Sequence, residues 1–165
     1  MSHAFTLLPS PVGVLTLVAR DASLAAVLWE HERANRVALG ELHRDDGNPV
    51  LREASRQLGE YFGGERERFD LPLSFAGTTF QRQVWQALLS IPFGETRSYA
   101  QIAAQIGNPT AVRAVGAANG RNPISIIAPC HRVIGAAGAL TGFAGGLEAK
   151  RYLLNLEARQ GAWGF

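Results

Sequence analysis

The segment from Arg121 to Ile134 constrains the fold of this chain more than any other, because it leads an apolar run into the only cysteine. It reads RNPISIIAPCHRVI. The β-branched residues of Ile124 to Ile127 favour an extended strand. Pro129 then fixes φ and removes a backbone donor, so regular strand pairing must stop there. The sequence therefore predicts a single thiol, Cys130, at the end of a strand.

The residues after Cys130 leave two interpretations of the thiol open. His131 and Arg132 follow directly, and positive charge beside a thiol lowers its pKa and favours the nucleophilic thiolate. A free cysteine is also a common small apolar residue of protein cores. Composition alone does not choose between a reactive thiol and an inert one.

The composition allows a hydrophobic core and favours an intracellular setting. A length of 165 residues suits one domain or two small ones. The N-terminus lacks a basic region followed by an apolar run, and no apolar stretch approaches a membrane span in length. One cysteine excludes an internal disulfide and a cysteine-rich zinc site. We therefore expect a cytoplasmic protein without a metal, a cofactor or a membrane partner.

Charge is distributed unevenly along the chain. Residues 1–75 carry eight Arg against eleven Asp and Glu, a net charge of −3. Residues 76–165 carry eight Arg or Lys against three acids, a net charge of +5. A basic half beside a mildly acidic half suggests that the second half binds a polyanion, with ordinary surface variation as the alternative.

The first half predicts a meander of three short strands followed by one helix. The strands are expected at Ala4–Leu8, Val14–Arg20 and Leu24–Trp29. Asn48 and Pro49 are typical of a helix start, and Gly63 ends the apolar pattern that follows. Residues 33–47 are predicted to be irregular, and residues 69–73 to form a short strand. The histidines of this half are scattered, so we interpret it as a scaffold.

The second half, from Gly77 onwards, predicts a series of short helices. Thr78 and Ser98 each precede a glutamine by three residues, which is the pattern of a capping box. Gly107 ends the second helix, and a third is expected from Pro109 to Asn119. Two short helices joined by a glycine turn, the second carrying arginine, are typical of a helix-turn-helix.

The predicted helix from Pro109 to Asn119 has an unusual surface for a DNA-reading helix. Val112 and Val115 share the side expected to face the core. The opposite side carries one long side chain, Arg113. The other residues of that side are small: Ala111, Ala114 and Ala118. Such a face permits close approach to a minor groove, whereas major-groove readers need longer polar side chains. An alanine-rich helix buried on both faces is the alternative.

Beyond the cysteine we expect a hairpin wing and a final helix. A glycine-rich connector, residues 135–139, joins Val133-Ile134 to Leu140-Thr141. The final helix is expected over residues 147–158, and its predicted packing residues are Leu147, Tyr152, Leu153, Leu154 and Leu156. Glu157 lies near the C-terminal end, where the helix dipole disfavours a carboxylate unless a partner such as His131 faces it. A solvated acid is the alternative.

Several short motifs follow one another along the second half of the chain. The main one is Pro129-Cys130-His131-Arg132-Val133, preceded by Arg121-Asn122-Pro123. The others are Gly94-Glu95 with Ser98-Tyr99, Gly107-Asn108-Pro109, Arg113-Ala114-Val115-Gly116 and Gly145-Gly146-Leu147. In order and spacing the chain resembles the O6-alkylguanine-DNA alkyltransferase family, also called methylated-DNA–protein-cysteine methyltransferases. The match covers residues 78–158, whereas the first half agrees only in length and in its order of strands and helix.

The resemblance implies a mixed α/β (α+β) fold of two domains. Residues 1–76 would form an RNase H-like β-meander with a helix, and residues 77–165 a winged helix-turn-helix domain that binds DNA. The implied activity is repair by one irreversible, stoichiometric transfer of an alkyl group from O6-alkylguanine to Cys130, with O4-alkylthymine as a second candidate substrate. The implied partner is double-stranded DNA with alkylated bases. A monomer is expected in solution, with cooperative assembly on DNA as a further expectation.

The resemblance also implies a role for each matching residue near the thiol. Cys130 would attack the alkyl carbon. His131 would act as the base through a bridging water, and Glu157 would orient its imidazole. Asn122 would brace the segment that carries the cysteine. Tyr99 would donate its hydroxyl proton toward guanine N3.

Five further residues are implied in DNA binding. Arg113 would fill the stack vacated by the flipped base, next to Ala114 on the DNA-facing helix. Backbone groups of Val133 and Ala144 would bind the base edge, beside the Phe143 ring. Tyrosine and serine are common in relatives where Phe143 and Ala144 stand here, so no side-chain hydroxyl contact is expected at either position.

Two other functions fit part of the pattern. A winged-helix DNA-binding regulator would leave Cys130 inert. A cysteine hydrolase would use Cys130 and His131, but it needs an oxyanion hole, of which the sequence offers no sign. The hydrolase would also leave the basic half unexplained.

Overall fold

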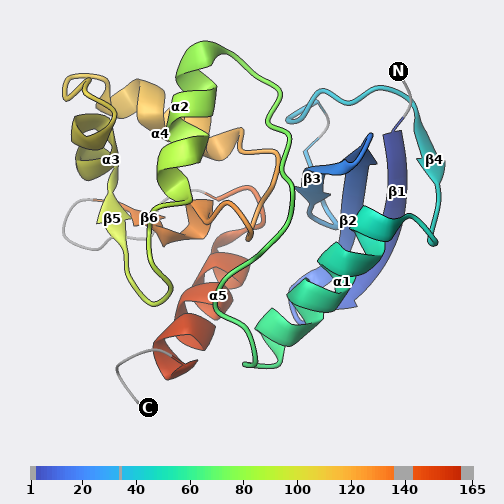
Figure 1. Cartoon of the computed structure of the whole chain (residues 1–165). Helices are drawn as coiled ribbons and strands as arrows, with labels where there is room; N and C mark the ends of the chain where they lie inside the picture. The colour runs from blue at the N-terminus through green and yellow to red at the C-terminus, as the bar shows by residue number, and fades with distance from the viewer. Residues whose placement is uncertain (1–2, 34, 136–142, 161–165) are drawn as a thin grey trace.

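The computed structural model describes residues 3–33, 35–135 and 143–160. The chain begins with a four-stranded sheet in the order β3-β2-β1-β4 (Figure 1). Its strands are β1 (His3–Ser10), β2 (Gly13–Arg20), β3 (Ser23–Leu28) and β4 (Leu42–Arg44). The pairs β1–β2 and β2–β3 are antiparallel, which confirms the predicted meander.

β4 lies in a segment that was predicted to be irregular. It pairs in parallel with the first residues of β1. All of its side chains are exposed, so no apolar alternation marks it in the sequence. The strand predicted at residues 69–73 was wrong, because only a single bridge joins Leu24 to Leu73 there. Pro72 lacks an N–H and bonds through its carbonyl, which accepts from the Leu24 N–H at 2.8 Å.

Helix α1 (Pro49–Phe62) packs against the sheet (Figure 1). Its start is confirmed, because the Asn48 side chain accepts from the N–H groups of Val50 at 3.0 Å and Leu51 at 3.2 Å. The apolar residues of its buried face recur at helical spacing: Leu51, Ala54, Leu58 and Tyr61. This face and the sheet enclose the core of the first half.

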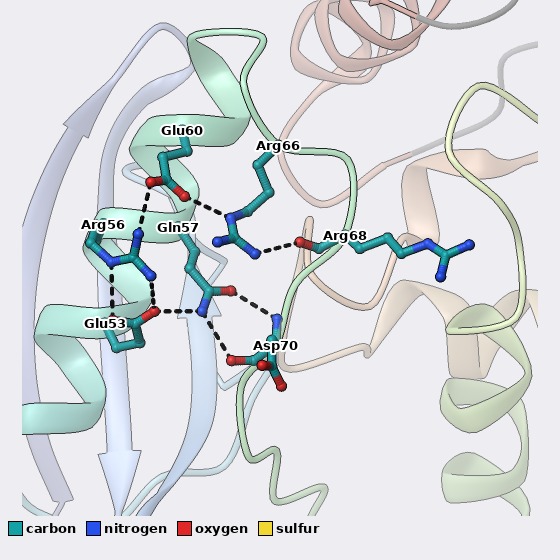
Figure 2. Close-up of polar contacts among 7 residues, drawn as sticks. All are labelled: Glu53, Arg56, Gln57, Glu60, Arg66, Arg68 and Asp70. Carbon is teal, nitrogen blue, oxygen red and sulfur yellow. Dashed lines mark hydrogen bonds and ion pairs between the residues drawn. The ribbon is translucent and has the colours of Figure 1, made fainter.

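A polar network holds the chain that leaves α1 against the helix (Figure 2). Gln57 bonds the backbone of Asp70 in both directions, with Nε2 2.9 Å from the carbonyl and the N–H 2.8 Å from Oε1. Arg66 donates to Glu60 at 2.8 Å. These contacts fix the path of residues 63–70 beside the last turns of α1.

The second half is built from helices. They are α2 (Thr79–Leu88), α3 (Tyr99–Gln105), α4 (Val112–Gly120) and α5 (Leu147–Gln160). Both predicted capping boxes are present, since Thr78 accepts from the Gln81 N–H and Ser98 from the Gln101 N–H, each at 3.1 Å. Strands in the first half and helices in the second confirm the expected mixed α/β class.

Two short strands, β5 (Arg97–Ser98) and β6 (Val133–Ile134), pair in parallel beside these helices. The hairpin wing predicted after β6 falls on residues 136–142, which lie outside the described residues.

α4 begins later than predicted, at Val112, and turns a different face to the core. Val115 and Ala118 are buried, whereas Val112 is 37% exposed. The predictions that Val112 faces the core and that Ala118 faces outward were therefore wrong. The buried stripe also includes Asn119, whose amide turns inward and donates to the Cys130 carbonyl at 3.4 Å.

α5 also has a buried face that differs from the prediction. Leu153 is buried as predicted, but Leu147 is 43% exposed and Tyr152 is 38% exposed. Lys150 and Glu157 occupy the buried face instead. Because both are charged and find polar partners inside the protein, apolar periodicity assigns the wrong face to this helix.

The segment that leads to the cysteine is attached to β3. The Val27 N–H donates to the Pro123 carbonyl at 2.9 Å, and Val27 bridges Ile124 in parallel. Ile124, Ile126 and Ile127 are buried in the same core cluster as the sheet. The first half thus provides the surface on which the cysteine segment folds.

Candidate active site

Cys130 opens a single turn of 3-10 helix, η1 (Cys130–Arg132), rather than ending a strand as predicted. The extended run before it is broken at Ile126, whose φ of 74° lies in the left-handed region. A three-residue turn closes there, with the Ile127 N–H 2.9 Å from the Ser125 carbonyl. Burial of the isoleucine side chains holds this unfavourable backbone conformation in place.

The Cys130 thiol is free and buried. The residue is 3% exposed, and the polar side chains of Asn122 and Ser125 lie close enough to favour its ionised form. Burial raises the pKa of the Cys130 thiol, and the opposing effects of the Asn122 amide and of nearby cations, Arg36 first, are smaller. The expectation of a lowered thiol pKa was wrong, because desolvation outweighs the positive charge.

Asn122 and Ser125 shape the loop that carries the thiol. The Asn122 side chain is completely buried; its Oδ1 accepts from the Ile124 N–H at 3.0 Å, and its Nδ2 donates to the Ala128 carbonyl at 2.8 Å. The Ser125 hydroxyl accepts from the Trp29 indole N–H at 3.1 Å. One amide therefore ties the two ends of the loop together, and a side chain next to β3 anchors its middle.

His131 and Glu157 form a buried pair behind the cysteine. Nε2 of His131 lies 2.7 Å from Oε2 of Glu157. Burial lowers the pKa of His131, and the charge of Glu157 offsets this only in part. Burial opposes ionisation of Glu157, but His131 and Arg132 outweigh it and hold the pKa of Glu157 well below its usual range.

The ionised carboxylate determines the tautomer of His131. Because Glu157 can only accept, we infer that Nε2 carries the imidazole proton and that Nδ1 is an acceptor. Nδ1 is buried and has no hydrogen-bond partner among the described residues. The ring therefore has a proton acceptor inside the protein, one residue from the thiol.

Two more side chains donate to the Glu157 carboxylate. Arg132 donates from Nε to Oε1 at 2.8 Å and from Nη2 to Oε2 at 3.0 Å. The Tyr61 hydroxyl donates to Oε2 at 2.6 Å. Arg132 also donates to the Ile91 carbonyl at 2.7 Å. The buried ion pair is thus hydrogen-bonded at both carboxylate oxygens.

Lys150, also from α5, bonds the residue that follows η1. It is completely buried, its Nζ donates to the Val133 carbonyl at 2.7 Å, and it lies 5.7 Å from the Phe143 ring centroid. Burial lowers the pKa of Lys150, against the smaller effect of Cys130. The Val133 N–H bonds the Cys130 carbonyl. Both backbone groups of Val133 therefore already have partners, and its carbonyl keeps a second lone pair for a ligand.

Within residues 3–33, 35–135 and 143–160, no three His, Cys, Asp or Glu side chains are grouped so that they could hold a metal ion. None of the helices in that part of the chain has both the length and the apolar character that crossing a bilayer requires.

Comparison with known proteins identifies the family. A family model for the ribonuclease-like domain of 6-O-methylguanine DNA methyltransferase matches residues 4–75, and one for its DNA binding domain matches residues 79–159. The methylated-DNA–protein-cysteine methyltransferase of Mycolicibacterium paratuberculosis is 52% identical over 151 residues, covering 91% of this chain and 89% of the relative. This chain belongs to the methylated-DNA–protein-cysteine methyltransferase family. The resemblance predicted from the motifs is confirmed.

Other members of this methyltransferase family match over similar lengths. The relative from Methanosarcina acetivorans is 49% identical over 154 residues, covering 93% of this chain and 97% of its own. The crystal structure of Mycobacterium tuberculosis OGT in complex with DNA has a TM-score of 0.87 at 48% identity, covering 97% of this chain and 94% of that one. The likeness therefore extends through both halves of the fold.

In this methyltransferase the structure gathers part of the predicted site into one cluster. Asn122, His131 and Glu157 lie with Cys130, linked by the contacts described above. Tyr99 begins α3 and packs against the apolar cluster that contains Cys130. Asn122, Cys130 and His131 share one segment of the chain, whereas Tyr99 and Glu157 come from α3 and α5.

Four of the predicted DNA-contacting residues lie farther out, whereas Val133 is buried in the same cluster as Cys130. Arg113 and Ala114 are exposed on α4, together with Ala117. Phe143 and Ala144 are half-buried after the gap in the described residues. The Phe143 ring packs edge-on against Trp29 at 5.4 Å between centroids. No residue on α4 carries a longer side chain on the exposed face than Arg113.

Sequence reasoning missed several residues of the cluster. Tyr61 lies in the apolar pattern of α1, and no role in the site was predicted for it or for Lys150 or Ser125. Arg36, from the segment predicted to be irregular, donates to the Asn122 carbonyl at 2.9 Å. The sequence held one indication for Tyr61: the hydroxyl of a buried tyrosine needs a polar partner. That indication does not say which partner.

Proposed function

We propose that this protein repairs DNA by moving a methyl or larger alkyl group from guanine O6 to its own Cys130, in one irreversible turnover. The observation that carries the proposal is the buried cluster in which Asn122 braces the loop of the single thiol and the His131–Glu157 pair lies next to it. The M. tuberculosis relative was crystallised with DNA, and the curated relatives are named methylated-DNA–protein-cysteine methyltransferases. O4-alkylthymine is a second substrate that the same chemistry allows.

The raised thiol pKa means that Cys130 is protonated before the lesion arrives. Its proton must leave during the reaction, and Nδ1 of His131 is the nearby acceptor. A bridging water carries the proton from Sγ to Nδ1. The negative charge of Glu157 stabilises the imidazolium that forms. Generating the thiolate only at this point limits its reaction with other electrophiles.

Alkyl transfer follows as a displacement at the alkyl carbon. The Sγ–carbon bond forms, the carbon–O6 bond breaks, and its electron pair stays on the guanine. Tyr99 donates its hydroxyl proton to N3, so that the base leaves neutral. The tyrosinate then regains a proton, and the imidazolium loses one, through solvent. A thioether is not easily reversed, so each protein molecule acts once.

The duplex is proposed to lie against α4. Exposed Ala114 and Ala117 permit close approach of the helix to a minor groove, with Arg113 projecting from the same face. The damaged base must leave the duplex to meet a buried thiol, and Arg113 fills the space it vacates. The residues proposed to surround the flipped base are Val133, Phe143 and Ala144.

We also propose a division into an N-terminal domain, residues 1–76, and a DNA-binding acceptor domain, residues 77–165. The change from strands to helices near this point supports the division. A cytoplasmic location is proposed because a reducing compartment keeps the single thiol free for alkyl transfer. Action as a monomer, with cooperative assembly on DNA, stays a prediction.

The test is intact-mass measurement after incubation with a duplex oligonucleotide that carries O6-methylguanine. A gain of one methyl group located on Cys130, and absent in Cys130→Ala, is expected. Unchanged mass with retained DNA binding would indicate a winged-helix module with an inert thiol. Several product molecules per protein molecule would indicate a hydrolase.

A further inference from the structure

We propose that Tyr61, from the N-terminal half, is a positioning residue for alkyl transfer. Its hydroxyl holds the Glu157 carboxylate so that His131 keeps its proton on Nε2 and presents Nδ1 toward the thiol. This inference rests on the proposed function. It assigns a part in the chemistry to a half of the chain whose sequence indicates only a scaffold.

The geometry joins the tyrosine to the imidazole through one oxygen atom. Tyr61 is 1% exposed, and its hydroxyl lies 2.6 Å from Oε2 of Glu157. The same Oε2 lies 2.7 Å from Nε2 of His131. Any rotation of the carboxylate that breaks one of these bonds strains the other. Tyr61 and the ion pair with Arg132 therefore fix the orientation of the group that fixes the imidazole.

The Tyr61 hydroxyl is itself held rigidly. Its ring packs edge-on against Phe62 at 5.3 Å and Phe93 at 6.3 Å, and in tilted contact with Phe69 at 5.4 Å. The polar network of Figure 2 secures the chain segment that carries Phe69 against α1. Burial, and then the charge of Glu157, raise the pKa of Tyr61 well above its ordinary value. The hydroxyl therefore stays a donor throughout the working pH range.

The hydroxyl also tunes the charge that faces His131. The titratable and charged groups around the imidazole are Glu157 and Lys150 from α5, Cys130 and Arg132 from η1, and Tyr61 from α1. Without the hydroxyl, Oε2 has one donor fewer, and more of its negative charge acts on the imidazole. This raises the pKa of His131, and an imidazolium cannot take the thiol proton. Loss of the hydroxyl should therefore misplace the base and raise the pH below which it is protonated.

Tyr61→Phe removes the hydroxyl and keeps the ring. Single-turnover rates of methyl transfer to Cys130 are measured by intact mass between about pH 5 and 9 with saturating methylated duplex. At neutral pH we expect transfer on the order of tenfold slower, because the imidazole is held less firmly in place, with unchanged DNA affinity. The acid limb of the rate profile should move to higher pH. Tyr152→Phe, which removes a hydroxyl from the exposed side of α5, is the matched control and should behave as wild type.

The outcomes separate this inference from the proposed function. A wild-type protein that gains no methyl group overturns the proposed function itself. A wild-type protein that is methylated, with the same rate and pH profile in Tyr61→Phe, overturns the positioning role even if the variant melts earlier. If Tyr61→Phe does not fold, nitrogen NMR of the wild-type protein decides. A proton on Nε2 of His131 and a hydrogen-bonded Tyr61 hydroxyl proton are expected, and a proton on Nδ1 would refute the inference.

Discussion

Oε2 of Glu157 lies 2.7 Å from Nε2 of His131, and both side chains are withdrawn from solvent although they come from separate elements, α5 and η1. Arg132 donates to both oxygens of the same carboxylate. In such a buried cluster each charge depends on its partner, because little water is present to replace it. Removal of the carboxylate charge therefore affects stability as well as chemistry.

Glu157→Gln is expected to lower the free energy of unfolding by about 3–5 kcal/mol, since the Arg132 charge then stays buried without a counter-charge. Chemical unfolding measures this. Glu95→Gln is the matched control, because the Glu95–Arg97 pair at 3.1 Å is exposed and should contribute about 0–1 kcal/mol. Equally small losses in both variants would contradict the buried ion pair.

Acidification is expected to destabilise the fold from neutral pH downwards. The pKa of Glu157 is lowered in the folded protein, so its contribution is present above the ordinary value of 4.5 and is lost as the pH falls below it. The pKa of His131 is also lowered, so below its ordinary value of 6.5 the unfolded chain binds the proton more readily than the folded one. Protonation of Glu157 and of the unfolded chain's His131 therefore both lower the free energy of unfolding as the pH falls. Urea unfolding between about pH 7.5 and 4 measures them, and constant stability down to about pH 5 would contradict the His131 contribution.

Without DNA, Cys130 is expected to react slowly with iodoacetamide at neutral pH. Burial raises the pKa of its thiol, so the rate should rise with a midpoint above the ordinary value of 9.0. The urea-unfolded protein is the control, because it exposes the same single thiol. Faster reaction in the folded protein at neutral pH would show that the resting thiol is ionised after all.

Gly145→Ala is expected to destabilise the protein by about 1–3 kcal/mol and to slow alkyl transfer. An added Cβ would lie 2.6 Å from the Trp29 ring, and Trp29 anchors Ser125 beside the thiol. Gly59→Ala is the control, since its Cβ would meet nothing within 4 Å and should stabilise α1 by about 0.5–1 kcal/mol. Thermal unfolding and single-turnover rates measure both variants. Unchanged stability in Gly145→Ala would argue against the tight packing of this loop.

Arg113→Ala is expected to slow repair of duplex DNA on the order of tenfold or more, because the vacated stack is then left unfilled. Transfer from free O6-methylguanine, which needs no base flipping, should fall much less. Arg82→Ala, an exposed arginine on α2, is the control for a general loss of positive charge. Equal losses on duplex and free base would rule out the stack-filling role.

Local features of the chain were predictable because their partners lie a few residues away. The caps at Asn48, Thr78 and Ser98 each bond N–H groups two or three residues on, so a short pattern contains the whole interaction. The motif around Cys130 was recognisable for the same reason, since its residues are contiguous. The face of α5 was not predictable, because Lys150 and Glu157 are buried against the apolar pattern.

By itself the sequence determined the family, the starts of α1, α2 and α3, and the single candidate nucleophile. Only the tertiary structure decided the pKa of that thiol and which side chains surround it. The thiol pKa is raised because residues distant in the chain remove Cys130 from water. Tyr61 meets Glu157 across 96 positions of sequence, and the order of residues does not encode such a meeting as a local pattern. It arises from the packing of α1 and α5 around one shared core, in which a buried hydroxyl and a buried carboxylate satisfy each other.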